Sequence, residues 1–256
     1  MSVFLHSLQS EWLKRRRSTA SILVWSGSFL IPALFLISRF DDMSNLAAAN
    51  ANPHIWENLF NRHWQFMALF LLPMGLVLAT SLVTQLEFRN NTWKQVHTTP
   101  QSLHTIFWTK LTVILIMLLM FFILFNIGIY LTAVIPVMVP GVHYPVEPFP
   151  FKKIAEANSL FLLDCLPIVA LQFGLGLQSR NFLIPFGVGI GLYVGSMIGL
   201  LWRHGYIIPY IYCALNVGGK KPGGPYAVNH HYWAAGWTIG LIGLAYILYI
   251  TKKDKS

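Results

Sequence analysis

Long runs of apolar residues alternate with short polar segments along this chain. The six longest runs cover residues 19–38, 64–86, 111–139, 158–177, 182–201 and 233–250. A helix needs about 20 predominantly apolar residues to cross the hydrocarbon core of a bilayer, and a helix satisfies its own backbone hydrogen bonds in lipid. The pattern therefore predicts an all-α, polytopic membrane protein with six transmembrane helices. The third run is longer than one crossing needs and is expected to end near Pro136.

The composition agrees with a membrane protein and excludes two other classes. Of the 256 residues, 55% are hydrophobic and only 11% are charged, whereas soluble domains carry about 25% charged residues. A disordered chain would combine low hydrophobicity with high charge. The net charge of +9 would suit nucleic acid only on a soluble basic module. In a membrane protein it indicates topology and contact with anionic lipid, so no nucleic-acid partner is expected.

The distribution of basic residues predicts the orientation of the chain, because cytoplasmic loops carry an excess of Lys and Arg. With a cytoplasmic amino terminus, eleven basic residues lie inside: Lys14, Arg15, Arg16, Arg17, Arg89, Lys94, Lys110, Arg180, Lys252, Lys253 and Lys255. Seven lie outside: Arg39, Arg62, Lys152, Lys153, Arg203, Lys220 and Lys221. Both termini are therefore predicted to be cytoplasmic, and residues 1–256 are expected to form a single transmembrane domain.

Residues 1–17 precede the first apolar run and have their own pattern. Their apolar residues recur at helical spacing: Phe4, Leu5, Leu8, Trp12 and Leu13. This favours an amphipathic helix at the membrane interface, although a plain cytoplasmic extension with a topogenic basic cluster remains the alternative. The run 19–38 exceeds the apolar core of about 7–15 residues that is typical of a cleaved signal peptide, so it is expected to be retained.

Residues 87–110 form the longest inner segment between two runs. A short helix is expected from about Thr92 to Thr98, and Pro100 should end it because proline donates no backbone hydrogen bond. Ser102 can then cap the helix that leads into the third run. This pattern is typical of a short helix that lies along the membrane and binds a cytoplasmic partner. A structural loop that binds no partner would have the same pattern.

The residues of this segment resemble those of a known family. Glu87 ends the second run, and it is followed by Asn91-Thr92-Trp93-Lys94, Thr98-Thr99-Pro100 and Lys110. The arrangement resembles the intracellular coupling segment of ABC transporter permeases, in particular the type-2 export permeases of the lantibiotic-immunity and bacitracin-resistance branch. The resemblance covers nearly the whole chain. It departs from the usual pattern at Asn90-Asn91, where a small residue often precedes the threonine.

The resemblance implies the membrane subunit of an ATP-driven exporter in the bacterial cytoplasmic membrane. Its substrate would be amphiphilic or peptide-like, as in antimicrobial peptide resistance. A separate ATPase subunit would bind ATP and Mg²⁺, and a second permease copy would complete a homodimer or heterodimer. The ATPase-coupling residues implied are Glu87, Asn91, Thr92, Trp93, Lys94, Thr98, Thr99 and Pro100. The chain is not expected to be an enzyme or to bind a cofactor, since its Gly- and Lys-rich segment 218–224 lacks phosphate-binding-loop spacing.

Two features of the runs themselves invite a functional interpretation. Gly187, Gly191, Gly195 and Gly199 are spaced four apart, and such small residues let membrane helices approach closely. The partner is either a second subunit or another helix of the same chain. Asp164 is an ionisable residue inside the fourth run, where charge is costly. It is either the site of an ion-coupled secondary transporter or a polar group near the outer interface, paired with a neighbour such as Asn158.

The outer loop at residues 202–232 includes an apolar piece, 206–217, that is too short to cross a bilayer and is expected to be re-entrant or interfacial. Six histidines lie outside: His54, His63, His143, His204, His230 and His231. They lack the HxxxH and HExxH spacings of zinc sites, so no metal site is expected. The aromatic residues of the outer segments are expected to anchor the chain at the interface: Trp56, Trp64, Trp202, Trp233, Tyr206, Tyr210 and Tyr232.

Overall fold

The computed structural model describes residues 2–16, 18–89, 102–217 and 228–251, and no strand occurs within these ranges. Five helical segments are long and apolar enough to cross a membrane: Thr19–Asp41, Ile55–Leu86, Leu103–Met138, Phe151–Gln178 and His230–Ile250. A sixth apolar helix, Leu183–Gly199, is shorter. Each of the six apolar runs in the sequence therefore corresponds to a helix, which confirms the all-α, polytopic membrane fold.

The elements follow one another as α1 (Ser2–Arg15), α2 (Thr19–Asp41), α3 (Met43–Asn50), α4 (Ile55–Phe66), the π-helix η1 (Met67–Leu71), α5 (Leu72–Arg89), α7 (Leu103–Val134), the 3-10 helix η2 (Ile135–Met138), α8 (Phe151–Gln178), α9 (Leu183–Gly199), the 3-10 helices η3 (Gly205–Ile207) and η4 (Pro209–Ile211), α10 (Tyr212–Val217) and α11 (His230–Ile250). As expected, the third run loses its α-helical form just before Pro136, and Ser102 caps α7 by accepting a hydrogen bond from the Thr105 backbone amide at 3.2 Å.

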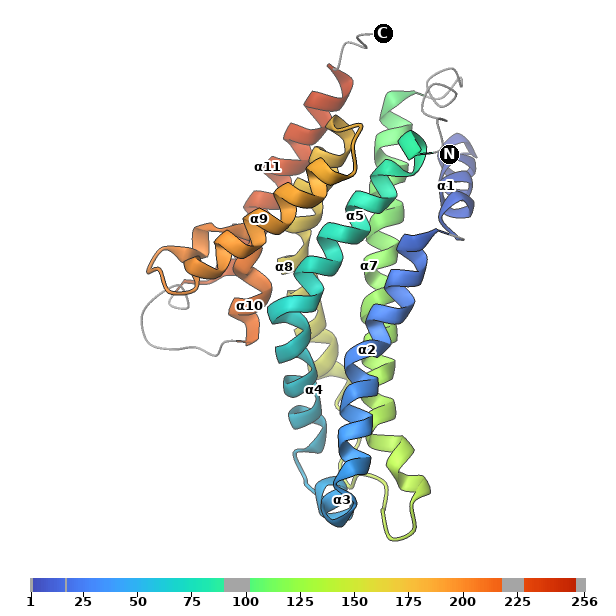
Figure 1. Ribbon diagram of the computed structural model, residues 1–256, viewed down its shortest axis with the longest axis vertical. Helices are drawn as coiled ribbons and strands as arrows, with labels where there is room; N and C mark the ends of the chain where they lie inside the picture. Colours follow the sequence, from blue (N-terminus) through green and yellow to red (C-terminus); the bar gives the residue numbers. More distant parts are fainter. Residues whose placement is uncertain (1, 17, 90–101, 218–227, 252–256) are drawn as a thin grey trace.

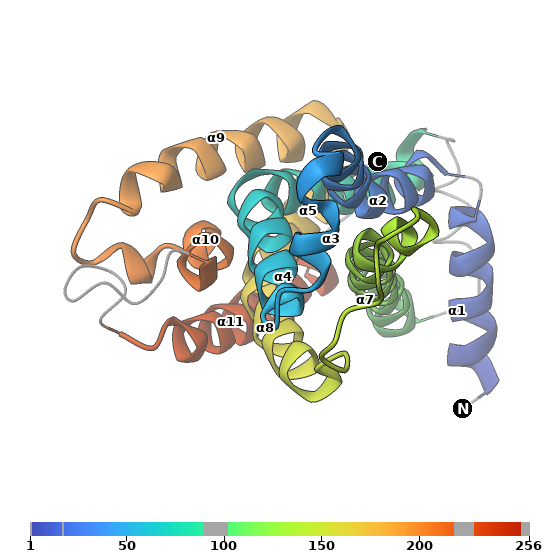
Figure 2. The same cartoon turned by 90° about the horizontal axis from the view of Figure 1, so that it is seen from below.

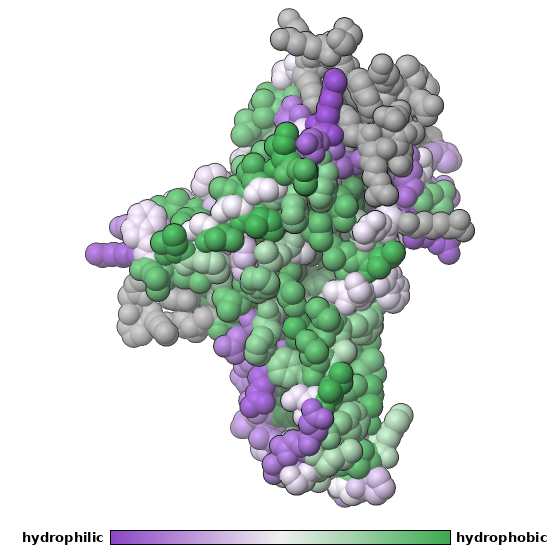
Figure 3. Space-filling model, viewed as in Figure 1, coloured by the Kyte–Doolittle hydropathy of each residue, from purple (hydrophilic) through white to green (hydrophobic). Residues whose placement is uncertain are grey.

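The long helices α2, α5, α7 and α8 run along one axis, and the described ends of the chain lie near the same end of the molecule (Figure 1). Helix α3 and the connection from η2 to α8 lie at the opposite end. Seen along this axis in Figure 2, α7 and α8 are viewed nearly end-on, whereas α1 and α9 lie across the view. Hydrophobic residues cover most of the face shown in Figure 3, and hydrophilic residues gather at its margins.

The second span begins at Ile55, earlier than the apolar run, because α4 is amphipathic. Its apolar face is buried against the neighbouring helices, and the π-helix η1 joins it to α5 without a break. The stacked rings of Trp64 and Phe161, with centroids 4.1 Å apart, link this span to α8. The interface-anchor prediction is wrong for three aromatic residues, since Trp56, Trp64 and Tyr210 are buried in the protein core.

Helix α1 packs across the start of α7 through its polar residues. The Ser7 hydroxyl donates to Thr109 Oγ1 at 3.4 Å, and Glu11 pairs with the buried Lys110 at 3.3 Å. The buried Arg15 guanidinium stacks 3.8 Å from the ring centroid of Trp12. The side chains of Phe4, Leu5 and Leu13 on α1 are exposed. They form an apolar surface that acyl chains can contact, as an interfacial helix requires.

Candidate functional site

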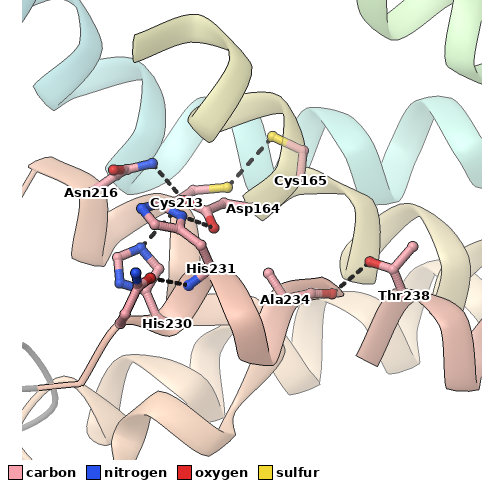
Figure 4. A network of polar contacts seen from close by, with 9 residues as sticks. Asp164, Cys165, Cys213, Asn216, His230, His231, Ala234 and Thr238 are labelled. Carbon is pink, nitrogen blue, oxygen red and sulfur yellow. Dashed lines mark hydrogen bonds and ion pairs between the residues drawn. The ribbon is translucent and has the colours of Figure 1, made fainter. Parts of the chain in front are cut away.

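A buried polar cluster joins three elements that are far apart in the sequence. Asp164 comes from the middle of α8, Asn216 from α10, and His230 and His231 from the first turn of α11 (Figure 4). The Asp164 side chain is fully buried. Because a buried carboxylate is stable only when it is paired or hydrogen-bonded, the cluster is the feature of the membrane region that most needs a chemical explanation.

Each oxygen of Asp164 has an imidazole partner. His230 Nε2 lies 3.3 Å from Oδ2, and His231 Nδ1 lies 3.0 Å from Oδ1. The Asn216 side-chain amide donates a short hydrogen bond to Oδ2. The two imidazole rings lie side by side with centroids 4.2 Å apart. The two imidazoles and the Asn216 amide therefore surround the carboxylate at one side of α8.

Local sequence explains how the two histidines reach the carboxylate. The Asn229 side chain caps α11 by accepting a hydrogen bond from the His231 backbone amide at 3.1 Å. This cap starts the helix at His230, so both imidazoles project from its first turn. The ring of Tyr212 on α10 stacks on His230 with a centroid separation of 5.9 Å. The start of α11 and the whole of α10 are thus held against α8.

Two free cysteines lie beside the cluster and support the same contact between elements. Cys165 follows Asp164 on α8, and its sulfur lies 3.6 Å from that of Cys213 on α10. Both thiols are buried. Since neither cysteine belongs to the Asp164 donor group, they act here as small packing residues.

The structure corrects the expected start of the fourth helix and the expected partner of Asp164. Helix α8 begins at Phe151 rather than at residue 158, so Asp164 lies near the centre of the helix. Asn158 is not its partner, because Asn158 exchanges hydrogen bonds with Asn126 at 3.0 and 3.1 Å. The His-His pair just before the last run was the sequence signal for the true partners, but its separation from Asp164 along the chain concealed the contact.

Polar side chains continue along the same helix towards the end where the described termini lie. Gln172, two turns beyond Asp164, donates to the Tyr210 hydroxyl at 2.7 Å. Gln85 on α5 donates to the Ser179 carbonyl at 2.7 Å and to the Gly176 carbonyl at 3.2 Å. These bonds fix α5 and η4 to α8 and satisfy amides that would otherwise be costly inside a bilayer.

The expected coupling segment lies mostly outside the described residues. Glu87 belongs to the last turn of α5, while Asn91, Thr92, Trp93, Lys94, Thr98, Thr99 and Pro100 fall in the range that the structure does not describe. The description resumes at Ser102 and includes Lys110, which is 4% exposed and contacts Glu11 of α1. The coupling role of residues 87–110 therefore remains a prediction. The contact between Lys110 and Glu11 lies at the end of this segment.

The four regularly spaced glycines of α9 lie in two different environments. Gly187, Gly191 and Gly195 are exposed, and a Cβ atom added at any of them would meet nothing within 4 Å. Gly199 is buried, and its added Cβ would lie 2.6 Å from the Ile208 side chain. Packing within this subunit thus uses only the last of the four glycines.

An apolar cavity of about 420 Å³ lies among α2, α5, α7 and α9. Its lining includes Gly27, Gly75, Ala79, Phe121 and Ile190. A cavity of this size and apolar lining is typical of sites for small hydrophobic or amphiphilic ligands. It lies apart from the Asp164 cluster, because none of that cluster's four residues lines it.

The family comparison identifies a large part of this architecture. A model of the ABC-2 family transporter proteins matches residues 7–196, a range that begins within α1 and ends within α9. No curated protein and no solved structure matches the chain.

Proposed function

The chain belongs to the ABC-2 family of transporter proteins, and from this membership we propose that it is the membrane subunit of an exporter of amphiphilic, peptide-like molecules. Its branch would be that of the lantibiotic-immunity and bacitracin-resistance permeases, in the bacterial cytoplasmic membrane. The whole chain would act as one permease domain. Membership of this family favours ATP-driven transport over the alternative hypothesis of an ion-coupled secondary transporter that uses Asp164.

The observation that supports an amphiphilic substrate is the apolar cavity among α2, α5, α7 and α9. Phe121 contributes an aromatic surface, while Gly27 and Gly75 leave room between the helices because no side chain fills it. An acyl chain or apolar peptide side chain would gain favourable free energy there by leaving water or headgroups. A polar substrate would gain nothing from such a lining.

Energy would come from a separate ATPase subunit that binds ATP and Mg²⁺ and docks on residues 87–110. Helix α1 lies beside this region, since its Glu11 pairs with Lys110 at 3.3 Å. Closure of two ATPase subunits could therefore move α1 and the start of α7 together. Movement of α7 would alter the cavity directly, because Ile114, Met117 and Phe121 of α7 line it.

A second permease copy, identical or related, would pack against α9. Gly187, Gly191 and Gly195 lie exposed on this helix, and a Cβ atom added at any of them would meet nothing within 4 Å among the described residues. In a bilayer, a row of small residues lets the backbone of another helix approach closely. This supports the dimer over packing within the subunit for these three positions.

Filling the cavity tests the substrate proposal. Gly75→Phe places a ring where an added Cβ meets nothing within 4 Å, so the fold should survive. Resistance of cells to membrane-active peptides, and ATP-driven uptake of such peptides into inverted vesicles, should fall at least about tenfold, the effect of about 1.4 kcal/mol in binding. Gly243→Phe on α11 is the matched control, because its surroundings are equally open. Equal transport by both variants would refute binding in this cavity.

Replacement of Glu87 by Ala tests the coupling proposal separately. Co-purification should still recover the ATPase subunit if the rest of the segment docks, but substrate should no longer stimulate ATP hydrolysis. Substrate-stimulated hydrolysis and transport at the level of the unchanged protein would contradict a coupling role for Glu87.

A further inference from the structure

The Asp164 cluster has the donor atoms of a transition-metal site. One carboxylate oxygen and the ring nitrogens of His230 and His231 all lie within 4.8 Å of one another. Neutral imidazole and carboxylate are two of the three ligand types that hold Zn²⁺ in proteins, and histidine is the commonest metal ligand of all. No feature of the exporter proposal requires this arrangement.

The spacing of the donors is close to what zinc needs. Ligand atoms at about 2.0–2.2 Å from a tetrahedral Zn²⁺ lie roughly 3.3–3.5 Å from each other. His230 Nε2 lies 3.3 Å from Oδ2 of Asp164, and His231 Nδ1 lies 3.0 Å from its Oδ1, so each ring has one carboxylate oxygen at nearly this separation. Because the three ligand atoms lie within 4.8 Å of one another, rotation of the side chains would bring them to the separation that one ion needs.

The charge of the site also calls for a cation. Among the described residues, the ion-pair partners found for Asp164 are the two histidines, and no Lys or Arg pairs with it. A fully buried carboxylate is expensive without a positive partner. A divalent ion held by neutral imidazoles would supply that charge and use both rings as ligands.

The surroundings of the donors would orient them, as the outer shell of a metal site does. The amide of Asn216 donates to Asp164 Oδ2, and the capping contact of Asn229 fixes the backbone at His231. Hydrogen bonds of this kind hold metal ligands in place and are as much a part of the site as the ligands themselves. The His230 and His231 side chains are 12% and 20% exposed, so an ion and a water ligand have a path of entry.

We propose that Asp164, His230 and His231 bind one Zn²⁺ ion, with water in the fourth position. The ion connects α8 to the first turn of α11, and Asn216 extends the connection to α10. It is a structural clamp on the part of the chain that follows α9. In the predicted topology this part is the outer loop, so zinc would reach it from the non-cytoplasmic side.

The test measures metal binding by the full chain, purified in detergent with an affinity tag that contains no histidine. After treatment with a chelator and desalting, the protein is titrated with Zn²⁺, and separately with Mg²⁺, by calorimetry. One Zn²⁺ should bind per chain with micromolar or tighter affinity, while Mg²⁺ should not bind. Zn²⁺ should also raise the unfolding temperature of the protein.

The variants that test the ligands are Asp164→Asn and the double change His230→Ala with His231→Ala. Each should weaken Zn²⁺ binding by about 100-fold or more, as loss of a ligand does at protein metal sites. His204→Ala is the matched control, because His204 is an exposed histidine of the same outer region, and it should leave binding unchanged. His231→Ala alone, at the more exposed ligand, keeps the test valid if Asp164→Asn fails to fold.

X-ray absorption at the zinc edge should then show nitrogen and oxygen ligands without sulfur. Sulfur in the first shell would assign the ion to Cys165 and Cys213 and overturn the proposal. So would the absence of stoichiometric Zn²⁺ binding by the unchanged chain, since the cluster would then be a hydrogen-bonded carboxylate–imidazole group only. Retention of full affinity by the double variant would equally refute it. None of these outcomes depends on transport, so the exporter proposal is tested independently.

Discussion

Gly189 occupies the point where α9 crosses α5 and α8. A Cβ atom added there would lie 2.5 Å from Val77 Cγ1 and closer still to Gln172 Nε2. Gly189→Ala should therefore push α9 outwards or break the bond from Gln172 to the Tyr210 hydroxyl. We expect a loss of about 1–3 kcal/mol, the usual cost of overpacking a core, measured by thermal or denaturant unfolding in detergent. Gly191→Ala is the control, and equal stability of the two variants would contradict this packing.

Asn50 on α3 connects this helix to α2 and to the segment that follows η2 through its side chain. It is 1% exposed, its amide donates to the His143 carbonyl at 2.8 Å, and its oxygen accepts from Arg39 at 2.6 Å. Asn50→Ala leaves buried polar groups without a partner, so unfolding should cost about 1–3 kcal/mol less. Asn45→Ala, at an exposed position of the same helix, should change stability by less than about 0.5 kcal/mol. A similar loss of stability in both variants would show that the stability depends on α3 as a whole and not on the hydrogen bonds of Asn50.

Asp164 shows what the sequence could and could not reveal about single side chains. An aspartate inside an apolar run signals a polar site, because burial of charge is costly. Its partners are separated from it by 52 to 67 positions, and no local rule relates such positions. Asn158, the first residue of the predicted run, was the nearer candidate, but it satisfies its amide with Asn126 on α7.

Helix α1 provides an element whose docking should depend on pH. Burial disfavours the ionised form of Glu11, but attraction to Lys110 and contacts with Lys14 outweigh it and lower the Glu11 pKa below its ordinary value of 4.5. The ion pair therefore stabilises docking above about pH 4.5 and loses this contribution as the pH falls through the lowered pKa. Acidification from pH 7 to pH 3 should release α1 from α7.

The measurement is the distance between spin labels on His6→Cys, in α1, and Ile123→Cys, in α7, both at exposed positions. The distance should be short and narrow at pH 7 and become broad at low pH. Glu11→Gln should broaden it already at pH 7. An unchanged distance in that variant would show that Ser7 and Arg15 hold α1 without the ion pair.

Helix α9 leads to a prediction about the assembly of two copies. A cysteine at Gly195 faces away from its own chain, since an added Cβ there meets nothing within 4 Å. If two permeases meet along this helix, Gly195→Cys should form a crosslinked dimer in membranes treated with a mild oxidant. Gly243→Cys on α11 is equally open and should not. Crosslinking at Gly243 and not at Gly195 would move the interface to α11.

At the level of elements, the periodicity of the sequence was a good guide to helices but a poor guide to their ends. Helix α4 extends the second span to Ile55 because its buried face alternates with polar residues, a pattern that lowers the local hydropathy without breaking the helix. The same burial accounts for Trp56, whose ring stacks on Tyr130 and whose Nε1 donates to the Glu147 carbonyl. Tyrosine and tryptophan occur both at membrane interfaces and in protein cores. Only the tertiary contacts show which position a given aromatic residue occupies.

For the molecule as a whole, the six apolar runs were sufficient to predict the membrane class, since length and hydropathy alone require a spanning helix. They could not predict that residues 210–215, in the segment 206–217, would be buried in the protein, because the segment is too short to have a distinctive period. In the structure Tyr210, Ile211 and Tyr212 are almost fully buried, and α10 contacts α8, α4 and η1. We propose from this burial that the segment is re-entrant.

The orientation of the molecule gives the last prediction. The described termini lie near one end of the bundle, and α3 lies at the other (Figure 1). The bias of basic residues predicts that the end with the termini is cytoplasmic. Since Cys165 and Cys213 are buried, a membrane-impermeant thiol reagent should not reach them in the folded chain. Single cysteines introduced at exposed positions can therefore report the sidedness of each end.

Ser44→Cys, on α3, should react in intact cells, whereas Ser102→Cys, at the start of α7, should react only after the cells are opened. Both positions are exposed, so accessibility to the reagent depends on the side of the membrane and not on burial. Asn181→Cys, in the turn between α8 and α9, should behave like Ser102→Cys. The reverse pattern would invert the topology and place residues 87–110 outside, where no ATPase could reach them; the same three variants thus test the premise of the coupling proposal.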